Sequence, residues 1–342
     1  MTNKLTPVTT LITVPFPEDL LDKLQHISPR IRLVANQNRP VEDIPADLWN
    51  QVEVLYTDRH LPTPALVPNL RWIQFHYAGV DHVAGHPLLQ QHDLDITTLS
   101  GAAAPQVAEH ALLLILALGH KFPDLTATQA KAEWPRDRWE RLKPLEIRGS
   151  TVGLVGYGSI GREIARLLTP LGVRILAAKR DAMHPQDTGY MPEGMGDPQG
   201  DLFTRLYPIQ AVKAMIKECD FVVICLPLTP STRGIIAEAE LAAMKPGAYL
   251  VDVSRGGIVN PAALLPVLQE KRIAGAALDV FVEEPLPANS PFWKLPNVII
   301  TPHVSGISAS YSQRAMDLFT DNFKRYLSGG LLLNRYDSDL GY

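Results

Sequence analysis

The sequence predicts an α/β protein with two doubly wound parallel sheets. Short β-rich runs alternate with helical segments along most of the chain, which is the pattern of parallel strands joined by crossover helices. One β-rich run leads into the glycine-rich segment GYGSIG at 156–161 and then into a helical segment, as in dinucleotide-binding folds. At 342 residues the chain is too long for one ordinary core, and its 46% hydrophobic and 20% charged residues are typical of globular proteins.

The first hundred residues predict the first sheet. Its β-rich runs stand at 10–16, 31–36, 52–57 and 70–79. Between the first two runs, a segment with helical spacing of apolar residues carries Leu20, Leu21, Leu24 and Ile27. A long helix is expected at roughly 104–118, followed by the Trp- and Arg-rich stretch EWPRDRW.

A second sheet is predicted from Ser150 onward. Its strands are expected at 151–155, 173–178, 220–227, 247–254, 275–281 and 297–303. Helical segments separate most of these strands, which favours a doubly wound sheet. The segment Asp181–Pro208 is dense in Gly, Pro and Asp, so we interpret it as a surface insertion, either ordered or mobile. Near the end, 312–330 is an amphipathic helix that we expect to pack back onto one of the domains.

Composition excludes several classes of function. The net charge is −4 and both signs are spread along the chain, so neither a nucleic acid nor a membrane surface is predicted as a partner. The histidines form no tract with metal-ligand spacing, and no metal site is predicted. With only Cys219 and Cys225, no signal peptide pattern and no apolar run long enough to span a bilayer, the sequence predicts a cytoplasmic protein. Both cysteines are interpreted as small buried hydrophobes.

The glycine loop is the most specific local signal. Gly156 suits the tight turn, Gly158 lets the backbone approach a pyrophosphate, and Gly161 allows the helix to pack close to the strand. Ser159 and Ile160 complete the loop, and the helix that follows offers free N–H groups to the phosphates. Because the strand, loop, helix and next strand all fall where this motif requires, we predict a nicotinamide dinucleotide site here.

The residues that end the next strand bear on the choice of coenzyme. NAD enzymes usually carry an acid there for the ribose hydroxyls, whereas a cation accommodates the 2′-phosphate of NADP. Lys179 and Arg180 follow a strand that we expect to end at Ala178, and this slightly favours NADP over NAD. In the alternative, these cations are solvated and Asp181 reaches back to the ribose.

Three residue types that suit hydride transfer to a keto acid follow predicted strands. Arg255 lies in the turn SRGG, where a guanidinium can hold a carboxylate through two parallel hydrogen bonds. His303 ends the run NVIITPH, and an imidazole exchanges protons near neutral pH. Glu284 lies in DVFVEEP, and a carboxylate beside an imidazole favours the imidazolium; Glu283 could serve equally well on chemistry alone. Taken singly, each of these residues is more often an ordinary loop residue.

Together these motifs resemble the D-isomer-specific 2-hydroxyacid dehydrogenase family. The resemblance covers roughly Val107 to Gly306 through VAEHALLLILAL, GSTVGLVGYGSIG, CLPLTPSTRGII, MKPGAYLVDVSRGGIVN, GAALDVFVEEP and NVIITPHVSG. It implies an oxidoreductase that interconverts a 2-keto acid and its D-2-hydroxy acid with NAD(P). It also implies that Arg255 binds the substrate carboxylate and keto oxygen. The same resemblance implies that Glu284, rather than Glu283, pairs with the acid/base His303.

Further site residues come from the resemblance alone. Asp279 corresponds to the residue that contacts the nicotinamide carboxamide, and Pro227 and Thr232 correspond to residues of the cofactor pocket. The backbone of Ala78 and Gly79 corresponds to a cradle for the substrate carboxylate.

The resemblance also implies a domain arrangement. A dinucleotide-binding Rossmann domain at 103–305 is inserted into a smaller, flavodoxin-like substrate domain made of 1–102 and 306–342. A homodimer is implied, formed through the nucleotide domains with a contribution from EWPRDRW. The identity of the 2-hydroxy acid and the physiological direction are left open by the sequence.

Some positions depart from the family pattern. Lys179 stands where NAD-dependent members carry an acid, and the Asp181–Pro208 insertion is longer than the usual connection.

Formate dehydrogenases of this group carry Gln where Glu284 stands, so Glu284 argues against that activity. A nucleotide-sensing scaffold similar to the family's transcriptional co-repressors would keep the same three site residues, and is the main alternative. A structural protein with a Rossmann-like fold would not need them.

Overall fold

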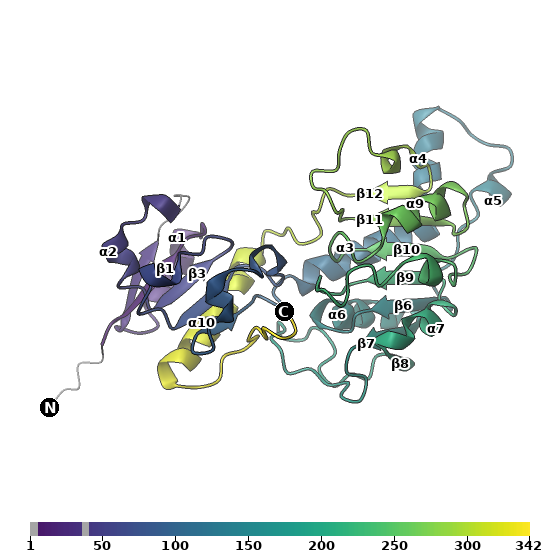
Figure 1. Cartoon of the computed structure of the whole chain (residues 1–342). Coiled ribbons are helices and arrows are strands. Elements are labelled where there is room, and N and C mark those ends of the chain that lie inside the picture. The colour runs from purple at the N-terminus through teal and green to yellow at the C-terminus, as the bar shows by residue number, and fades with distance from the viewer. Residues whose placement is uncertain (1–5, 36–40) are drawn as a thin grey trace. The chain divides into compact units, whose positions relative to one another are not determined.

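The computed structural model describes residues 6–35 and 41–342. They form two compact units: Met1–Ala103 together with Ser308–Tyr342, and Ala104–Ile307. Each unit has its own fully parallel sheet, and Figure 1 shows the helices that accompany each one. The predicted fold class is therefore confirmed, because a domain with a Rossmann sheet interrupts the chain of a smaller α/β domain.

The smaller unit has a sheet with the strand order β2-β1-β3-β4-β5. Its strands are β1 (Val8–Ile12), β2 (Ile31–Ala35), β3 (Val54–Thr57), β4 (Trp72–Phe75) and β5 (Asp95–Thr97). This is the order of flavodoxin-like sheets. Every strand pairs in parallel with its neighbour, so the carboxyl ends of all of them meet at one edge.

Helices α1 (Glu18–Gln25), α2 (Ala46–Trp49) and α10 (Tyr311–Ser328) belong to the same unit. The C-terminal helix α10 packs on the sheet through an aromatic cluster, since Phe319 lies 4.8 Å from Tyr56 and 5.2 Å from Trp72 between ring centroids. Phe319 and Phe323 are fully buried. Burial of this apolar stripe explains why a helix more than two hundred residues away in sequence completes the first sheet's domain.

The larger unit has a sheet with the order β12-β11-β10-β9-β6-β7-β8. Its strands are β6 (Thr151–Val155), β7 (Arg174–Lys179), β8 (Arg205–Pro208), β9 (Phe221–Ile224), β10 (Tyr249–Asp252), β11 (Gly275–Leu278) and β12 (Val298–Ile300). The strand order reverses between the neighbouring strands β6 and β9, because the chain crosses from β8 back to the other side of β6. Ligands of open α/β sheets bind at the carboxyl ends of the strands beside such a point.

Helices cover this second sheet. They are α3 (Ala104–Gly119), α4 (Phe122–Ala130), α5 (Arg138–Arg141), α6 (Ser159–Leu168), α7 (Val212–Ile216), α8 (Glu238–Leu241) and α9 (Pro261–Gln269). Residues of α7, α8 and α9 join β7, β9, β10 and β11 in one buried core. Helices α3 and α6 pack against each other.

The structure differs from the sequence predictions at a few elements. Strand β5 was not predicted, because its three residues show no alternation. The segment Asp181–Pro208 is not entirely a surface insertion, since its last four residues form the edge strand β8. Lys179 is the last residue of β7, one residue beyond the predicted end at Ala178. Asn36, at the end of a predicted strand, lies outside the described residues.

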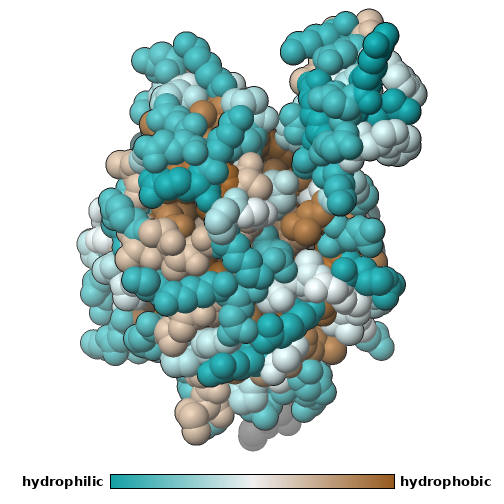
Figure 2. Space-filling view, turned by 90° about the vertical axis from the view of Figure 1, so that its right-hand side faces the viewer, coloured by the Kyte–Doolittle hydropathy of each residue, from teal (hydrophilic) through white to brown (hydrophobic). Residues whose placement is uncertain are grey.

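Within residues 6–35 and 41–342, none of the helices combines the length and the apolar character needed to cross a bilayer. On the face that Figure 2 shows, apolar patches are dispersed among hydrophilic residues.

Candidate active site

The carboxyl edge of the larger sheet carries most of the predicted site residues. The glycine loop follows β6, Lys179 ends β7, and Arg255 follows β10. Asp279 directly follows β11, and His303 comes three residues after β12. Because all these strands run parallel, their C-terminal residues stand at the same edge.

The glycine loop has the geometry that a phosphate site requires. Gly156 has a φ of +110°, and a Cβ atom there would lie 2.7 Å from the carbonyl oxygen of Cys225. A Cβ on Gly161 would lie 2.2 Å from the carbonyl oxygen of Gly156, so the start of α6 packs directly on the loop. Gly158, in contrast, has nothing within 4 Å of its Cβ position. The loop is therefore closed on the protein side and open at Gly158, where a pyrophosphate could approach the N-terminus of α6.

The insertion after β7 is bonded to this loop. The hydroxyl group of Tyr157, inside the glycine motif, donates to Asp197 Oδ2 at 2.6 Å. Arg162 in α6 is 1% exposed, and its guanidinium donates to the carbonyl oxygens of Asp197 and Pro185. Its Nε also lies 3.2 Å from Asp187 Oδ2. The insertion thus packs as an ordered second layer behind the glycine loop.

Two of the three residues considered for the coenzyme ribose, Lys179 and Asp181, form hydrogen bonds with residues of the insertion. Lys179 Nζ donates to the carbonyl oxygens of His184, at 2.7 Å, and Gln186, at 3.3 Å. The pKa of Lys179 is lowered mainly by burial and to a smaller extent by the positive charge of the nearby Arg162. Asp181 Oδ2 lies 2.7 Å from His184 Nδ1, and this hydrogen bond is the main reason that the pKa of Asp181 is lowered. Arg180 directly follows β7 and is exposed.

Glu284 and His303 are in direct contact. His303 Nδ1 lies 2.7 Å from Glu284 Oε2, and the other oxygen of Glu284 accepts the backbone N–H of Phe281 at 2.8 Å. The side chains remain 40% and 35% exposed, respectively. Nε2 of His303 has no hydrogen-bond partner among the described residues. Glu283 is exposed and makes no ion pair or hydrogen bond with any described residue.

The backbone around His303 is held by Asp279. The carboxylate of Asp279 is fully buried and accepts the Thr301 hydroxyl at 2.6 Å and the backbone N–H groups of Val304 at 3.0 Å and Ser305 at 3.1 Å. Its backbone oxygen accepts the N–H of His303 at 2.9 Å. Burial alone would raise the pKa of Asp279, but hydrogen bonds from Ser305 and Thr301 and from the backbone lower it overall.

Sequence reasoning did not single out the partners of Asp279. Thr301 and Ser305 flank His303, and Nε2 of His110 in α3 lies 3.2 Å from the Thr301 hydroxyl and 3.8 Å from Asp279 Oδ1. The available signal was a histidine in the apolar run of α3 and hydroxyl residues on both sides of His303. With both carboxylate oxygens occupied, Asp279 fixes the loop that presents the imidazole.

Arg255 lies in a turn that packs on the loop before Glu284. A Cβ on the adjacent Gly256 would lie 1.9 Å from the carbonyl oxygen of Phe281, so only glycine allows this approach. Nη1 of Arg255 donates to the carbonyl oxygen of Ser254 at 2.9 Å. The close packing joins the turn that carries the guanidinium to the loop that carries the carboxylate.

The remaining predicted residues lie in two places. In the larger unit, the Thr232 hydroxyl donates to the carbonyl oxygen of Pro227 at 2.7 Å, which closes the loop after β9. In the smaller unit, Ala78 and Gly79 follow β4 at the carboxyl edge of that sheet and are partly exposed. Within the described residues, no cluster of His, Cys, Asp and Glu is arranged to hold a metal ion.

Known proteins resemble this chain in sequence and in fold. Residues 112–305 match the family profile described as D-isomer specific 2-hydroxyacid dehydrogenase, NAD binding domain. A glyoxylate reductase from Thermofilum pendens is 34% identical over 264 residues, which cover 77% of this chain and 73% of that protein. D-3-phosphoglycerate dehydrogenase from Methanocaldococcus jannaschii is 31% identical over 256 residues, and the match covers 75% of this chain but only 45% of that longer protein.

The fold comparison agrees with the sequence comparison. The crystal structure of a D-isomer specific 2-hydroxyacid dehydrogenase from Xanthobacter autotrophicus Py2, in complex with NADPH and MES, is similar with a TM-score of 0.80 and 25% identity. The similarity covers 99% of this chain and 100% of that one. The family profile matches more than half of the chain, and the glyoxylate reductase is matched over more than two thirds of its length. The chain therefore belongs to the D-isomer specific 2-hydroxyacid dehydrogenases, a family of NAD(P)-dependent oxidoreductases.

Proposed function

We propose that this protein reduces small 2-keto acids of the glyoxylate type to D-2-hydroxy acids with NADPH, and catalyses the reverse oxidation. One observation carries the proposal: an imidazole bonded to a carboxylate at 2.7 Å stands at the same sheet edge as an arginine turn and an open glycine loop. The similarity to a glyoxylate reductase supports the substrate class. The similarity to an NADPH complex supports the coenzyme.

His303 is the proposed proton donor for reduction. Glu284 accepts the Nδ1 proton of the imidazole, so Nε2 is the nitrogen that faces the reaction. When the keto oxygen gains electron density it needs a proton, and an imidazolium Nε2–H can supply it. In the oxidation direction the neutral Nε2 accepts the proton of the hydroxyl group. The carboxylate of Glu284 stabilises the imidazolium and fixes its orientation.

Arg255 is the proposed anchor of the substrate. A planar guanidinium can bind a carboxylate through two parallel hydrogen bonds and still direct an N–H at the neighbouring keto oxygen. That hydrogen bond strengthens as charge develops on the oxygen, and so it favours the transition state over the ground state. The backbone of Ala78 and Gly79, in the smaller unit, is proposed separately as a cradle for a substrate carboxylate.

The glycine loop and α6 are proposed to hold the pyrophosphate of the coenzyme, which supplies or accepts the hydride when bound. Gly158 is open to an approaching phosphate, and α6 directs its first backbone N–H groups toward that place. We propose Pro227, Thr232 and Asp279 as the side of the pocket around the nicotinamide. Asp279 would act there indirectly, because its carboxylate is already occupied by Thr301, Val304 and Ser305.

A spectrophotometric screen tests the activity. NADPH and NADH oxidation is followed with glyoxylate, hydroxypyruvate, pyruvate and bulkier 2-keto acids. We expect turnover with at least one of the small keto acids and a lower kcat/KM with branched or aromatic ones. A protein that binds NADPH but oxidises it with none of these compounds would instead support a nucleotide-sensing scaffold.

A further inference from the structure

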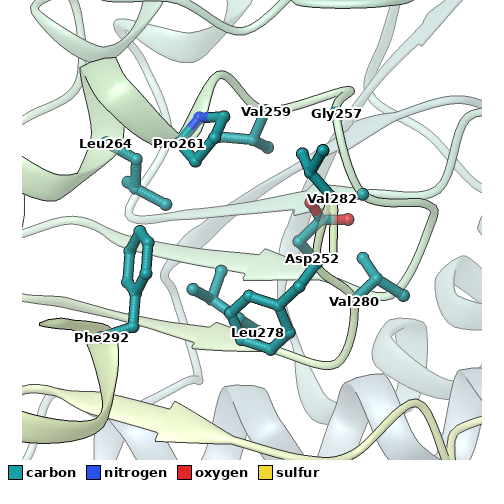
Figure 3. Close-up of a pocket in the computed structure, with 11 residues that line it drawn as sticks. Asp252, Gly257, Val259, Pro261, Leu264, Leu278, Val280, Val282 and Phe292 are labelled. Atoms are coloured by element: carbon teal, nitrogen blue, oxygen red, sulfur yellow. The ribbon is translucent and has the colours of Figure 1, made fainter. Parts of the chain in front are cut away.

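Asp252 is a buried carboxyl group directly behind the turn that carries Arg255. It is the last residue of β10, in an otherwise apolar strand, and is 3% exposed. Figure 3 shows its side chain among the other residues that line a small pocket, most of them apolar and contributed by β11, α9 and the adjoining loops. The pocket that it lines has a volume of about 30 Å³, enough for one or two water molecules.

Only one of the two carboxyl oxygens is bonded. Oδ1 of Asp252 accepts the backbone N–H of Ser254 at 3.1 Å and also the Ser254 hydroxyl. Oδ2 has no partner among the described residues. Ser254 is itself buried, and its carbonyl oxygen accepts Nη1 of Arg255. A continuous chain of hydrogen bonds therefore runs from Asp252 through Ser254 to the guanidinium.

The surroundings disfavour a negative charge on Asp252. The titratable groups that interact with it from neighbouring strands are Asp279, after β11, and the Cys225 thiol, after β9. Neither can compensate a carboxylate, because Asp279 is anionic and burial raises the pKa of Cys225 to about 12. Burial raises the pKa of Asp252 to about 7; the hydrogen bonds from Ser254 oppose this rise, and Asp279 adds to it.

We propose that Asp252 is a positioning residue that, in its neutral form, holds Ser254 and through it the Arg255 guanidinium in the geometry that binds the substrate. The proposal rests on the proposed function, because the substrate is what Arg255 binds. Loss of the proton leaves an uncompensated charge in an apolar pocket, which the turn can relieve only by moving toward solvent or admitting water. Substrate binding therefore weakens as Asp252 ionises, whereas the Glu284–His303 pair that transfers the proton is unaffected.

The first test separates KM from kcat. Both constants for the keto acid are measured at saturating NADPH from about pH 5.5 to 8.5, for the native protein and for Asp252→Asn, Asp252→Ala and Asp220→Asn. Asp220 is the matched control, because it is a partly exposed carboxylate beside β9 that pairs with Lys245 at 2.7 Å. We expect KM of the native protein and of the control Asp220→Asn to increase with pH above about pH 7. KM of Asp252→Asn should stay constant over the same range. Asp252→Ala should raise KM about tenfold at every pH, equivalent to 1.4 kcal/mol, with a smaller loss in kcat.

Opposite results overturn the proposal. If Asp252→Asn shows the same rise of KM with pH as the native protein, the titration belongs to another group. If Asp252→Ala keeps the native KM, Asp252 positions nothing. Should Asp252→Ala fail to fold, Ser254→Ala removes the hydroxyl bond to Asp252 and keeps the backbone bonds, and must raise KM more than it lowers kcat.

A second test does not depend on activity. The folded protein holds the Asp252 proton up to about pH 7, whereas the unfolded chain releases it at the ordinary carboxyl value. Stability should therefore fall as pH rises between these values and level off above pH 7. Urea unfolding of Asp252→Asn should lack this part of the decline, and an identical decline in both proteins contradicts the neutral carboxyl. The two conclusions can fail separately. If the stability of the native protein declines with pH and that of Asp252→Asn does not, but the native protein turns over no keto acid, the proposed function is refuted and the neutral carboxyl group of Asp252 is supported.

Discussion

The pairing of Glu284 with His303 distinguishes two neighbouring carboxylates that chemistry alone leaves equivalent. Glu284 is bonded to the imidazole at 2.7 Å, and Glu283 has no bonded partner among the described residues. The difference arises because the backbone N–H of Phe281 holds the other oxygen of Glu284.

Substitutions at this pair should rank in a defined order. His303→Ala should lower kcat for keto-acid reduction by about 10²–10⁴-fold, the usual contribution of a general acid. Glu284→Gln keeps a hydrogen bond but loses the charge, so its loss should be smaller. Glu283→Gln is the control and should be close to native. Steady-state kinetics at one pH check the order, and a loss in Glu283→Gln larger than that in Glu284→Gln would contradict the pairing.

The coenzyme preference is a second residue-level prediction. We expect kcat/KM to be higher with NADPH than with NADH, because Arg180 and Lys179 stand at the end of β7. Arg180→Ala should lower kcat/KM for NADPH by roughly tenfold to a hundredfold and leave the NADH value nearly unchanged. Lys179→Asp should narrow the preference as well, but it also breaks bonds to His184 and Gln186. A tenfold preference of the native protein for NADH would assign the ribose to Asp181.

Among the elements, the insertion after β7 is where sequence reasoning was least informative. Its Gly, Pro and Asp content predicted irregular structure correctly but could not show what the segment packs against. The ion pairs and hydrogen bonds of Arg162, Tyr157 and Asp197 join positions up to forty residues apart. Such contacts depend on tertiary folding, which no local pattern encodes.

Asp197 should be the main anchor of this element. Its carboxylate accepts the Tyr157 hydroxyl and the backbone N–H groups of Gly200, Asp201 and Leu202. Asp197→Ala leaves the buried Tyr157 hydroxyl without its acceptor and removes the side-chain acceptor of the three backbone N–H groups, so we expect a loss of about 2–4 kcal/mol in the free energy of unfolding, with a higher KM for NADPH. Glu193→Ala, an exposed position in the same insertion, is the control for urea unfolding. An unchanged unfolding midpoint in Asp197→Ala would show that the insertion is only loosely attached.

The same anchor gives a pH dependence. Burial tends to raise the pKa of Asp197, but the hydrogen bonds from Tyr157 and from the backbone outweigh burial and lower it. A lowered pKa in the folded state means that this stabilisation is complete at neutral pH and is lost as the pH falls below the ordinary carboxyl range. Acid unfolding of Asp197→Ala should therefore be less steep than that of the native protein.

Other elements were predictable to different degrees. The strand–glycine–helix junction and the strands before Arg255 and His303 were predicted because apolar runs and strand-end turns are local signals. Strands β5 and β8 were not, because each is a short edge strand stabilised by pairing with β4 or β7 rather than by its own composition. Asp279 was assigned to the nicotinamide by resemblance, and its bonds to Thr301, Val304 and Ser305 required the folded loop.

At the scale of the whole molecule, the predicted site residues are distributed over the two units. The larger unit carries the coenzyme loop, Arg255 and His303, and the smaller unit carries Ala78 and Gly79. The expected homodimer stays a prediction, to be checked by light scattering. Trp134 and Trp139, in the stretch implicated in the dimer, are 83% and 72% exposed, and apolar side chains as open as these are suited to an interface.

The most direct measurement of the central claim is keto-acid reduction by Arg255→Ala beside the native protein, with NADPH binding determined for both. We expect native turnover of a small 2-keto acid and a loss of kcat/KM of roughly a hundredfold or more in the variant, because about 3 kcal/mol of charge-assisted hydrogen bonds are removed. NADPH binding should be nearly unchanged, and Arg255→Lys should recover only part of the activity, since an ammonium cannot form the planar pair of bonds. An alanine variant with native kcat/KM would contradict the account, because Arg255 would then be an ordinary surface charge.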